Sequence, residues 1–118
     1  MADTALFIGW GTPVRDREQQ AMQVFTEAND YWHKLQDAGE IEDFDVFMLE
    51  PHGGDLSGFA VLKGDMQHLG NVHASDEFQK LVTRANLVVE DLGVVTATMN
   101  GAATEQVGLY ASMAAAMS

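Results

Sequence analysis

The stretch T-A-L-F-I-G-W, Thr4 to Trp10, is a short run that is apolar on both of its sides. Successive side chains of an extended strand point to opposite faces of a sheet, so Leu6 and Ile8 share one face. Ala5 and Phe7 share the other face. A strand with two apolar faces predicts a sheet that is covered on both sides.

A helix and a hairpin are predicted directly after this strand. From about Pro13 to Ala38, apolar residues recur every three or four positions, which predicts an amphipathic helix that ends at Gly39. Phe44–Leu49 and Phe59–Lys63 are rich in aromatic and branched residues and flank a glycine-rich loop. They therefore predict the two strands of a hairpin.

The second half of the chain predicts a further helix and a last strand. Met66–Val72 predicts a weak helical turn. Ser75 is a suitable N-cap for an apolar stripe over Phe78–Leu92, which predicts a helix that ends before Gly93. Val94–Met99 predicts the last strand.

The C-terminal segment Thr104–Met117 has a single charge, Glu105, and apolar residues that include Val107 and Tyr110 on one side. This pattern predicts a docking helix, and the alternative is a frayed tail. No repeat or linker divides the chain. We therefore expect one domain over residues 1–118, with residues 104–117 as its docking helix.

The predicted order of strand, helix, strand, strand, helix, strand is that of the α+β ferredoxin-like fold. In this fold a four-stranded antiparallel sheet carries two helices on one face, and here an extra C-terminal helix follows. The other face of the sheet would be bare. Because its side chains are also apolar, we expect two copies to pair their sheets in a homodimeric α/β barrel.

The charge balance excludes some partners. The 118 residues include eighteen acidic and six basic ones, for a formal net charge of −12. Nucleic acid and anionic membranes are bound through clustered basic residues, so we expect neither as a partner. The basic residues are spread along the chain: Arg15, Arg17, Lys34, Lys63, Lys80 and Arg84.

The chain contains no cysteine, which removes disulfides, thiolate chemistry and cysteine-based metal sites. The apolar run near the start is too short for a secretory signal, and no stretch is long enough to span a membrane, so we expect a cytoplasmic protein. The sequence also lacks the motifs of nucleotide-binding loops, zinc proteases and nucleophile elbows.

The four histidines do not form a metal site in the predicted fold. His52 lies in the hairpin loop at one end of the sheet. His33, His68 and His73 lie toward the opposite end, and the spacing of five between the last two is not that of a helical zinc pair. We therefore expect no metal and no other cofactor.

The residues Trp10, Arg15, His52 and Asp55 are the candidate ligand-binding site. All four are predicted at the same end of the sheet, where an indole face, a cation and a His–Asp pair would orient a small anionic or aromatic ligand. His52 would donate or accept a proton near neutral pH. The alternative is that the loop is a simple turn, with Asp55 capping backbone amides and His52 meeting water or a partner subunit.

Two stretches resemble small uncharacterised members of the dimeric α/β-barrel superfamily. They are LEPHGGDLSGF (Leu49–Phe59) and FQKLVTRANLVVEDLGVV (Phe78–Val95), and the likeness covers about residues 4–101. The resemblance implies a ferredoxin-like protomer that pairs its sheet with a second copy. The superfamily includes cofactor-free monooxygenases, haem-degrading enzymes, isomerases and binding domains, so it implies no single activity.

Three functional hypotheses follow from the sequence. The first is a homodimer that binds a small organic ligand in an apolar cavity. The second is a cofactor-independent monooxygenase-like or isomerase-like enzyme in which His52 moves a proton and Trp10 packs on the substrate. The third is a module that binds a partner through the C-terminal helix.

Overall fold

The order of helices and strands in the computed structural model is the predicted one, and the structure describes residues 2–118. The elements are β1 (Thr4–Trp10), α1 (Glu18–Asp37), β2 (Asp43–Met48), β3 (Gly58–Gly64), α2 (Met66–Ala74), α3 (Asp76–Asn86), β4 (Gly93–Thr98) and α4 (Asn100–Ala116). The strand predicted at Thr4–Trp10 is confirmed at both ends.

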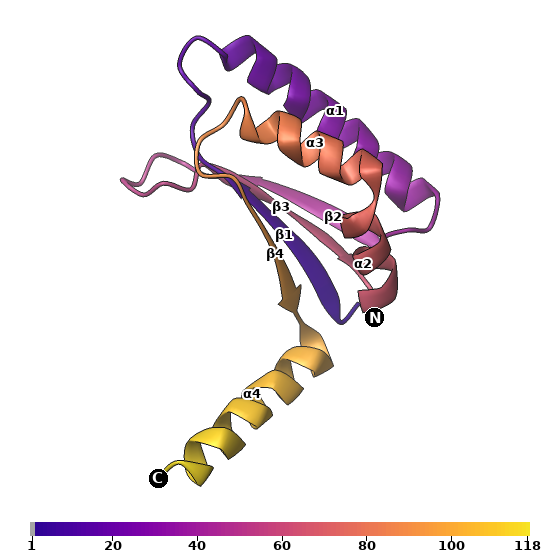
Figure 1. Ribbon diagram of the computed structural model, residues 1–118, viewed down its shortest axis with the longest axis vertical. Helices are drawn as coiled ribbons and strands as arrows, with labels where there is room; N and C mark the ends of the chain where they lie inside the picture. The colour runs from indigo at the N-terminus through magenta and orange to yellow at the C-terminus, as the bar shows by residue number, and fades with distance from the viewer. Residues whose placement is uncertain (1) are drawn as a thin grey trace.

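The four strands form one sheet in the order β2-β3-β1-β4, and every neighbouring pair is antiparallel. Figure 1 shows α1 and α3 side by side over one face of this sheet, with α2 at its end. This arrangement confirms the predicted ferredoxin-like fold. It also confirms that β1 and β2 point the same way, since both are antiparallel to β3.

The core lies between the sheet and the helices. Leu6 and Ile8 of β1 and Ala60 and Leu62 of β3 point into it, and all four are buried. The helices contribute buried residues to the same cluster, among them Ala28, Tyr31, Trp32, Leu35, Leu69, Val72 and Phe78. The alternation along the strands therefore places every second residue in this core.

The opposite face of the sheet is lined by a row of stacked aromatic side chains. The ring centroids of Phe47 and Phe59 are 4.7 Å apart, and those of Phe7 and Phe59 are 5.0 Å apart. We call Phe47, Phe59 and Phe7 the phenylalanine row. Val95 of β4, which is paired with Phe7, is mostly exposed on the same face. Strands β1 and β3 thus have two largely apolar faces, whereas β2 places Asp43 and Asp45 beside Phe47 on the uncovered face. Helices α1, α2 and α3 lie on the opposite face of the sheet (Figure 1).

Two predicted helix boundaries are wrong for a shared reason. The backbone N–H of Val14 donates to the oxygen of Val88 at 2.8 Å, and Pro13 forms a β-bridge with Val89. Helix α1 therefore begins at Glu18 rather than near Pro13, and α3 ends at Asn86 rather than at Leu92. We call residues 11–14 and 88–90 the strap.

The apolar stripe of α3 continues past the helix because the strap also faces the interior. Val88 is buried, and Val89 packs beside it. Branched side chains at both positions favour extended backbone, and Asp91 has a left-handed φ of 54°, which ends any helical path. Helical spacing of apolar residues therefore overestimated the length of α3.

Helix α2 is longer than the predicted turn because both of its ends are defined by side chains. Asp65 is its N-cap and accepts a 2.8 Å hydrogen bond from the backbone N–H of His68. Ser75 ends α2 and caps α3, accepting from the backbone N–H of Phe78 as predicted. The two helices are therefore consecutive, with one residue between them.

Helix α4 begins at Asn100, four residues earlier than predicted, and leads away from the rest of the chain (Figure 1). None of its residues is buried. Its start is held at the sheet, since the Asn100 side chain donates to the oxygen of Ala2 at 2.6 Å. The radius of gyration is 16.2 Å, whereas about 13.5 Å is typical of a compact chain of this length.

Candidate ligand-binding site

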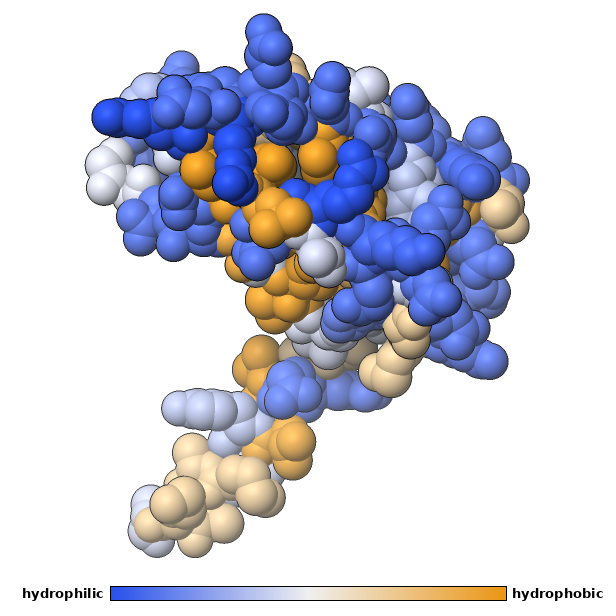
Figure 2. Space-filling view, turned by 45° about the horizontal axis from the view of Figure 1, so that its top comes forward, coloured by the Kyte–Doolittle hydropathy of each residue, from blue (hydrophilic) through white to orange (hydrophobic). Residues whose placement is uncertain are grey.

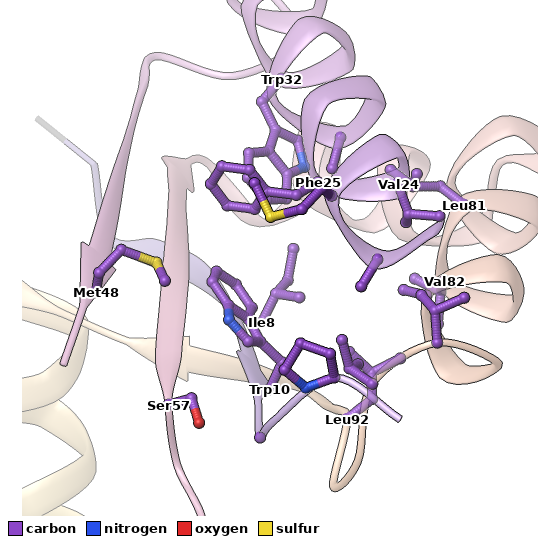
Figure 3. Close-up of a pocket in the computed structure, with 18 of the residues that line it drawn as sticks. Ile8, Trp10, Val24, Phe25, Trp32, Met48, Ser57, Leu81, Val82 and Leu92 are labelled. Atoms are coloured by element: carbon purple, nitrogen blue, oxygen red, sulfur yellow. The ribbon is translucent and has the colours of Figure 1, made fainter. Parts of the chain in front are cut away.

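A cavity of about 260 Å³ lies between the sheet and the helices α1 and α3. Figure 3 shows side chains from three elements around it: Ile8 and Trp10 from β1, Phe25 and Trp32 from α1, and Leu81 from α3. Gly11, Pro13, Val88 and Val89 of the strap also line the cavity. This space is therefore part of the helix-covered side of the sheet that side chains do not fill.

The wall of the cavity is almost entirely hydrocarbon and aromatic. Ser57 provides the single hydroxyl group, and no residue of the wall is ionisable. The wall consists of Ile8, Trp10, Gly11, Pro13, Ala21, Met22, Val24, Phe25, Ala28, Trp32, Met48, Ser57, Phe78, Leu81, Val82, Ala85, Val88, Val89 and Leu92. Such a surface binds apolar molecules by removing their surface from water.

Two methionines of the wall are largely exposed. Met22 of α1 and Met48 at the end of β2 are 62% and 67% exposed. Their positions on the apolar sides of α1 and β2 predict core filling, and this interpretation is wrong, because both lie where the cavity meets solvent. Figure 2 shows apolar surface between hydrophilic side chains on this end of the molecule. Methionine is flexible, so both side chains can adjust to an entering molecule.

Trp10 lines the cavity and is held in place by its neighbours. Its ring is edge-on to that of Phe25, with centroids 6.0 Å apart. A Cβ at Gly58 would lie 2.9 Å from the Trp10 indole and 2.8 Å from the backbone oxygen of Phe47. Glycine at position 58 therefore allows the indole to lie against β3.

Trp32 carries an unpaired donor in the wall of the cavity. The residue is 3% exposed. Within residues 2–118, its Nε1 is the one buried side-chain nitrogen or oxygen that has no hydrogen-bond partner. Burial without a partner costs about 1–3 kcal/mol for such a group.

His52 organises its own loop. The backbone N–H of Gly54 donates to Nδ1 at 3.2 Å, and Nε2 lies 2.7 Å from the backbone oxygen of Leu56. Because Nδ1 accepts a hydrogen bond, the proton of the neutral ring is on Nε2, which donates to Leu56. Both ring nitrogens are thus used within the loop, and His52 is not part of the cavity wall.

The structure brings one of the four predicted site residues to the cavity. Trp10 lines it, whereas Arg15, His52 and Asp55 do not. The side chains of Arg15 and Asp55 are exposed, and the backbone oxygen of Asp55 lies close to Gly11 in the strap. A role of all four residues in binding one ligand stays a prediction.

Arg84 links the two helices that cover the cavity. Its guanidinium forms an ion pair with Glu27 of α1, and this hydrogen bond lowers the pKa of the Glu27 carboxyl below its usual value. Arg17 donates to the oxygen of Leu87 at 2.6 Å and so ties the start of α1 to the end of α3. Both contacts join segments that are far apart in the sequence.

The remaining histidines lie toward the other end, as predicted. His68 Nδ1 is 2.6 Å from Asp65 Oδ2, while His33 and His73 pack edge-on against Phe44 and Phe78. Within residues 2–118, no three His, Asp or Glu side chains lie close enough to hold a metal ion. No helix in the same range is long and apolar enough to cross a membrane.

Comparison with known proteins identifies the fold. No protein-family sequence profile and no curated protein sequence matches the chain. An ethyl tert-butyl ether D (EthD) family protein from Bacillus halodurans matches the structure with a TM-score of 0.65 at 13% identity, over 83% of this chain and 99% of that one.

Two further solved structures share the fold. A dimeric protein of unknown function with a ferredoxin-like fold, from Bacteroides fragilis, has a TM-score of 0.58 at 10% identity, over 81% of this chain and 96% of its own. SnoaB, a cofactor-independent oxygenase from Streptomyces nogalater, has a TM-score of 0.53 at 14% identity, over 85% and 94%. The resemblance to dimeric α/β-barrel proteins is therefore confirmed for the fold, and the comparisons assign no activity.

Proposed function

We propose that the protein binds a small apolar organic molecule in the cavity between the sheet and helices α1 and α3. The observation that carries this proposal is the wall itself: about 260 Å³ of space bounded by hydrocarbon and aromatic side chains without an ionisable group. Protein interiors are normally filled by their own side chains. An unfilled apolar space of this size with exposed methionines at its edge is typical of a binding site.

The dimensions indicate the class of ligand. A cavity of about 150 Å³ accommodates benzene, so one of this size takes a molecule of roughly two fused or linked rings, or its aliphatic equivalent. A formal charge on the ligand would be buried without a counter-charge, which is costly. The cavity therefore favours a neutral molecule.

The experiment measures binding of the neutral dye N-phenyl-1-naphthylamine by its fluorescence. Ala21 and Ala85 line the cavity from α1 and α3, so Ala21→Leu and Ala85→Leu place extra carbon atoms inside it. We expect each variant to weaken dye binding at least tenfold while the melting temperature stays the same or rises. Ala74→Leu, at an exposed helix position outside the wall, is the matched control and leaves binding unchanged.

The experiment also has to distinguish dye that binds in the cavity from dye that binds to the phenylalanine row. If the dye bound to the phenylalanine row, Phe59→Asp would abolish its fluorescence and the cavity variants would not. That result, or unchanged binding in both cavity variants, would contradict the proposal.

The enzyme hypothesis is less well supported than binding alone. A cofactor-independent monooxygenase-like or isomerase-like reaction using His52 needs that ring near the substrate. The wall contains no general acid or base, and both nitrogens of His52 bond to its own loop. The variant His52→Ala tests the enzyme hypothesis. A less ordered loop with unchanged dye binding would support a purely structural role for His52.

We also propose that the protein functions as a homodimer that buries the phenylalanine row. Three stacked aromatic rings on an uncovered sheet face form a surface of the kind that mediates association. The dimeric ferredoxin-like protein of Bacteroides fragilis has the same fold, which supports this proposal. Sedimentation velocity of the full chain at micromolar concentration would reveal the dimer, and a monomer would overturn it.

A further inference from the structure

Helix α4 has apolar residues around most of its circumference, and none of its residues is buried. It has seventeen residues, one of them charged, and Val107, Leu109, Tyr110 and Met113 are all exposed, with Tyr110 at 77%. A helix that is hydrophobic all round is normally buried. Isolated helices of this length are marginal in water and gain most of their stability by packing. Another surface is therefore needed to cover α4.

That surface does not belong to the same chain. The start of α4 is fixed at the corner of the sheet, where Met99 N–H donates to the oxygen of Asp3 and the Asn100 side chain bonds Ala2. From this point the helix runs away from α1, α2 and α3 (Figure 1). It contacts β4 where it begins, and no residue along its length becomes buried.

We propose that α4 is an arm that packs against the uncovered sheet face of a second copy of this chain. This inference rests on the homodimer proposed above and specifies that α4, and not the partner's sheet, covers the phenylalanine row, which differs from the sheet-to-sheet barrel that the sequence predicts. The chain has two uncovered apolar surfaces, the phenylalanine row and α4, and neither can reach the other within one copy. In a twofold-symmetric dimer, α4 of each copy covers the phenylalanine row of the other copy, so the same contact forms twice.

The distribution of charge favours a second copy as the occupant. Two molecules with a net charge of −12 repel each other over most of their surfaces. The arm carries Glu105 as its sole charge, and the phenylalanine row carries none. Near one end of that face the charges are already paired, since Lys63 lies 2.6 Å from Asp45 and 3.7 Å from Asp43. These surfaces therefore allow two acidic copies to meet with little repulsion.

The dimensions of the two surfaces agree. Seventeen helical residues extend about 25 Å, and strands of six or seven residues extend roughly 20–23 Å. An arm of this length therefore spans the sheet. A membrane surface is a poorer occupant, because interfacial helices carry Lys or Arg on a polar face and α4 has neither.

The first experiment uses the full chain and compares two double variants by sedimentation velocity. Tyr110→Glu with Met113→Glu places charge on exposed apolar positions of the arm, so the fold of residues 2–98 is unaffected. Thr104→Glu with Ser112→Glu adds the same charge to the same helix at polar positions. We expect the first pair to raise the dimer dissociation constant at least tenfold and the control pair to change it less than threefold. Equal dissociation constants for the two variants would overturn the role of α4.

The second experiment uses the absence of cysteine. Met113→Cys in the arm and Val61→Cys on the uncovered sheet face are purified separately, mixed and oxidised. We expect a covalent heterodimer from this pair and none when Val61→Cys is replaced by Gln79→Cys, an exposed position on α3.

The outcomes distinguish this inference from the dimer itself. A dimer in which α4 forms no cross-link and tolerates the charged variants overturns the arm and leaves the homodimer intact. A full chain that stays monomeric at 50 micromolar overturns both.

Discussion

The two faces of the sheet are built by the same four strands and differ in what covers them. On one face Leu6, Ile8 and Leu62 are buried beneath α1 and α3, and the space that remains is the cavity. On the other face the phenylalanine row lies uncovered. The first face is completed within the chain except for a ligand-sized space, and the second needs another molecule.

Because of this difference, neighbouring residues of one strand have different roles. Leu62 and Val61 are adjacent in β3, and their side chains point to opposite faces. Leu62 is 0% exposed, whereas Val61 is only half-buried. A change at one should alter folding of the single chain, and a change at the other should alter association.

The largest expected effect is that of Leu62→Ala. Truncation of a fully buried leucine leaves a void and lowers the free energy of unfolding by about 2–4 kcal/mol. Urea titration followed by circular dichroism measures this loss, which we expect to be the same at low and high protein concentration. Val61→Ala is the matched change on the other face, and its smaller loss should grow with protein concentration. Equal losses in the two variants would contradict the contrast between the faces.

The fold could be predicted from the sequence because alternation and capping are local. The strand at Thr4–Trp10 and the cap at Ser75 are set by residues within a few positions of each other. The boundaries that were wrong depend on pairing of the strap, where Val14 meets Val88 across most of the chain. No local pattern distinguishes an apolar helix end from an apolar strap.

The second expected effect is the loss of association in Phe59→Asp. Phe59 stacks on both other members of the phenylalanine row, and a central aromatic residue of an interface contributes about 2 kcal/mol or more. The dissociation constant should therefore rise at least 30-fold in sedimentation experiments. Met66→Asp, at an exposed apolar position on α2, is the control and should leave association unchanged. An unaltered dimer in Phe59→Asp would place the interface elsewhere.

The candidate site was less predictable than the fold. Trp10 could be named because a large aromatic residue ends a strand, but Phe25, Trp32 and Met22 lie on the same apolar stripe as the core of α1. Periodicity shows that such residues face inward and does not show that space remains beside them. The unfilled space depends on the separation of α1, α3 and the sheet, which only the packed structure defines.

A smaller effect is expected from salt. Charge repulsion between two copies is screened within about 10 Å at 0.1 M salt and about 3 Å at 1 M. The apolar contacts are not weakened by this screening, so the dissociation constant of the dimer should fall several-fold between these concentrations. Sedimentation velocity in sodium chloride measures it, and binding of the neutral dye in the cavity is the control, since it should change much less. A dimer that weakens with salt would point to ion pairs at the interface instead.

The smallest expected effect is the contribution of the Asp65 carboxylate to stability. The hydrogen bond from the backbone N–H of His68, and then that of the His68 side chain, lower the pKa of Asp65 below its usual value of 3.8. A carboxyl with a lowered pKa in the folded state stabilises the protein above its unfolded pKa, and this contribution is lost as the pH falls through the folded value.

Asp65→Asn keeps a capping side chain at the start of α2 and removes the charge. We therefore expect the wild type to melt at a slightly higher temperature than the variant at pH 6, and this difference to shrink as the pH falls below 3.8. Asp55→Asn, in the exposed loop of His52, is the matched control. Because α2 packs on the helix-covered face, dye binding should follow this pH dependence more closely than dimerisation does, and the opposite order would show that the two faces are not independent.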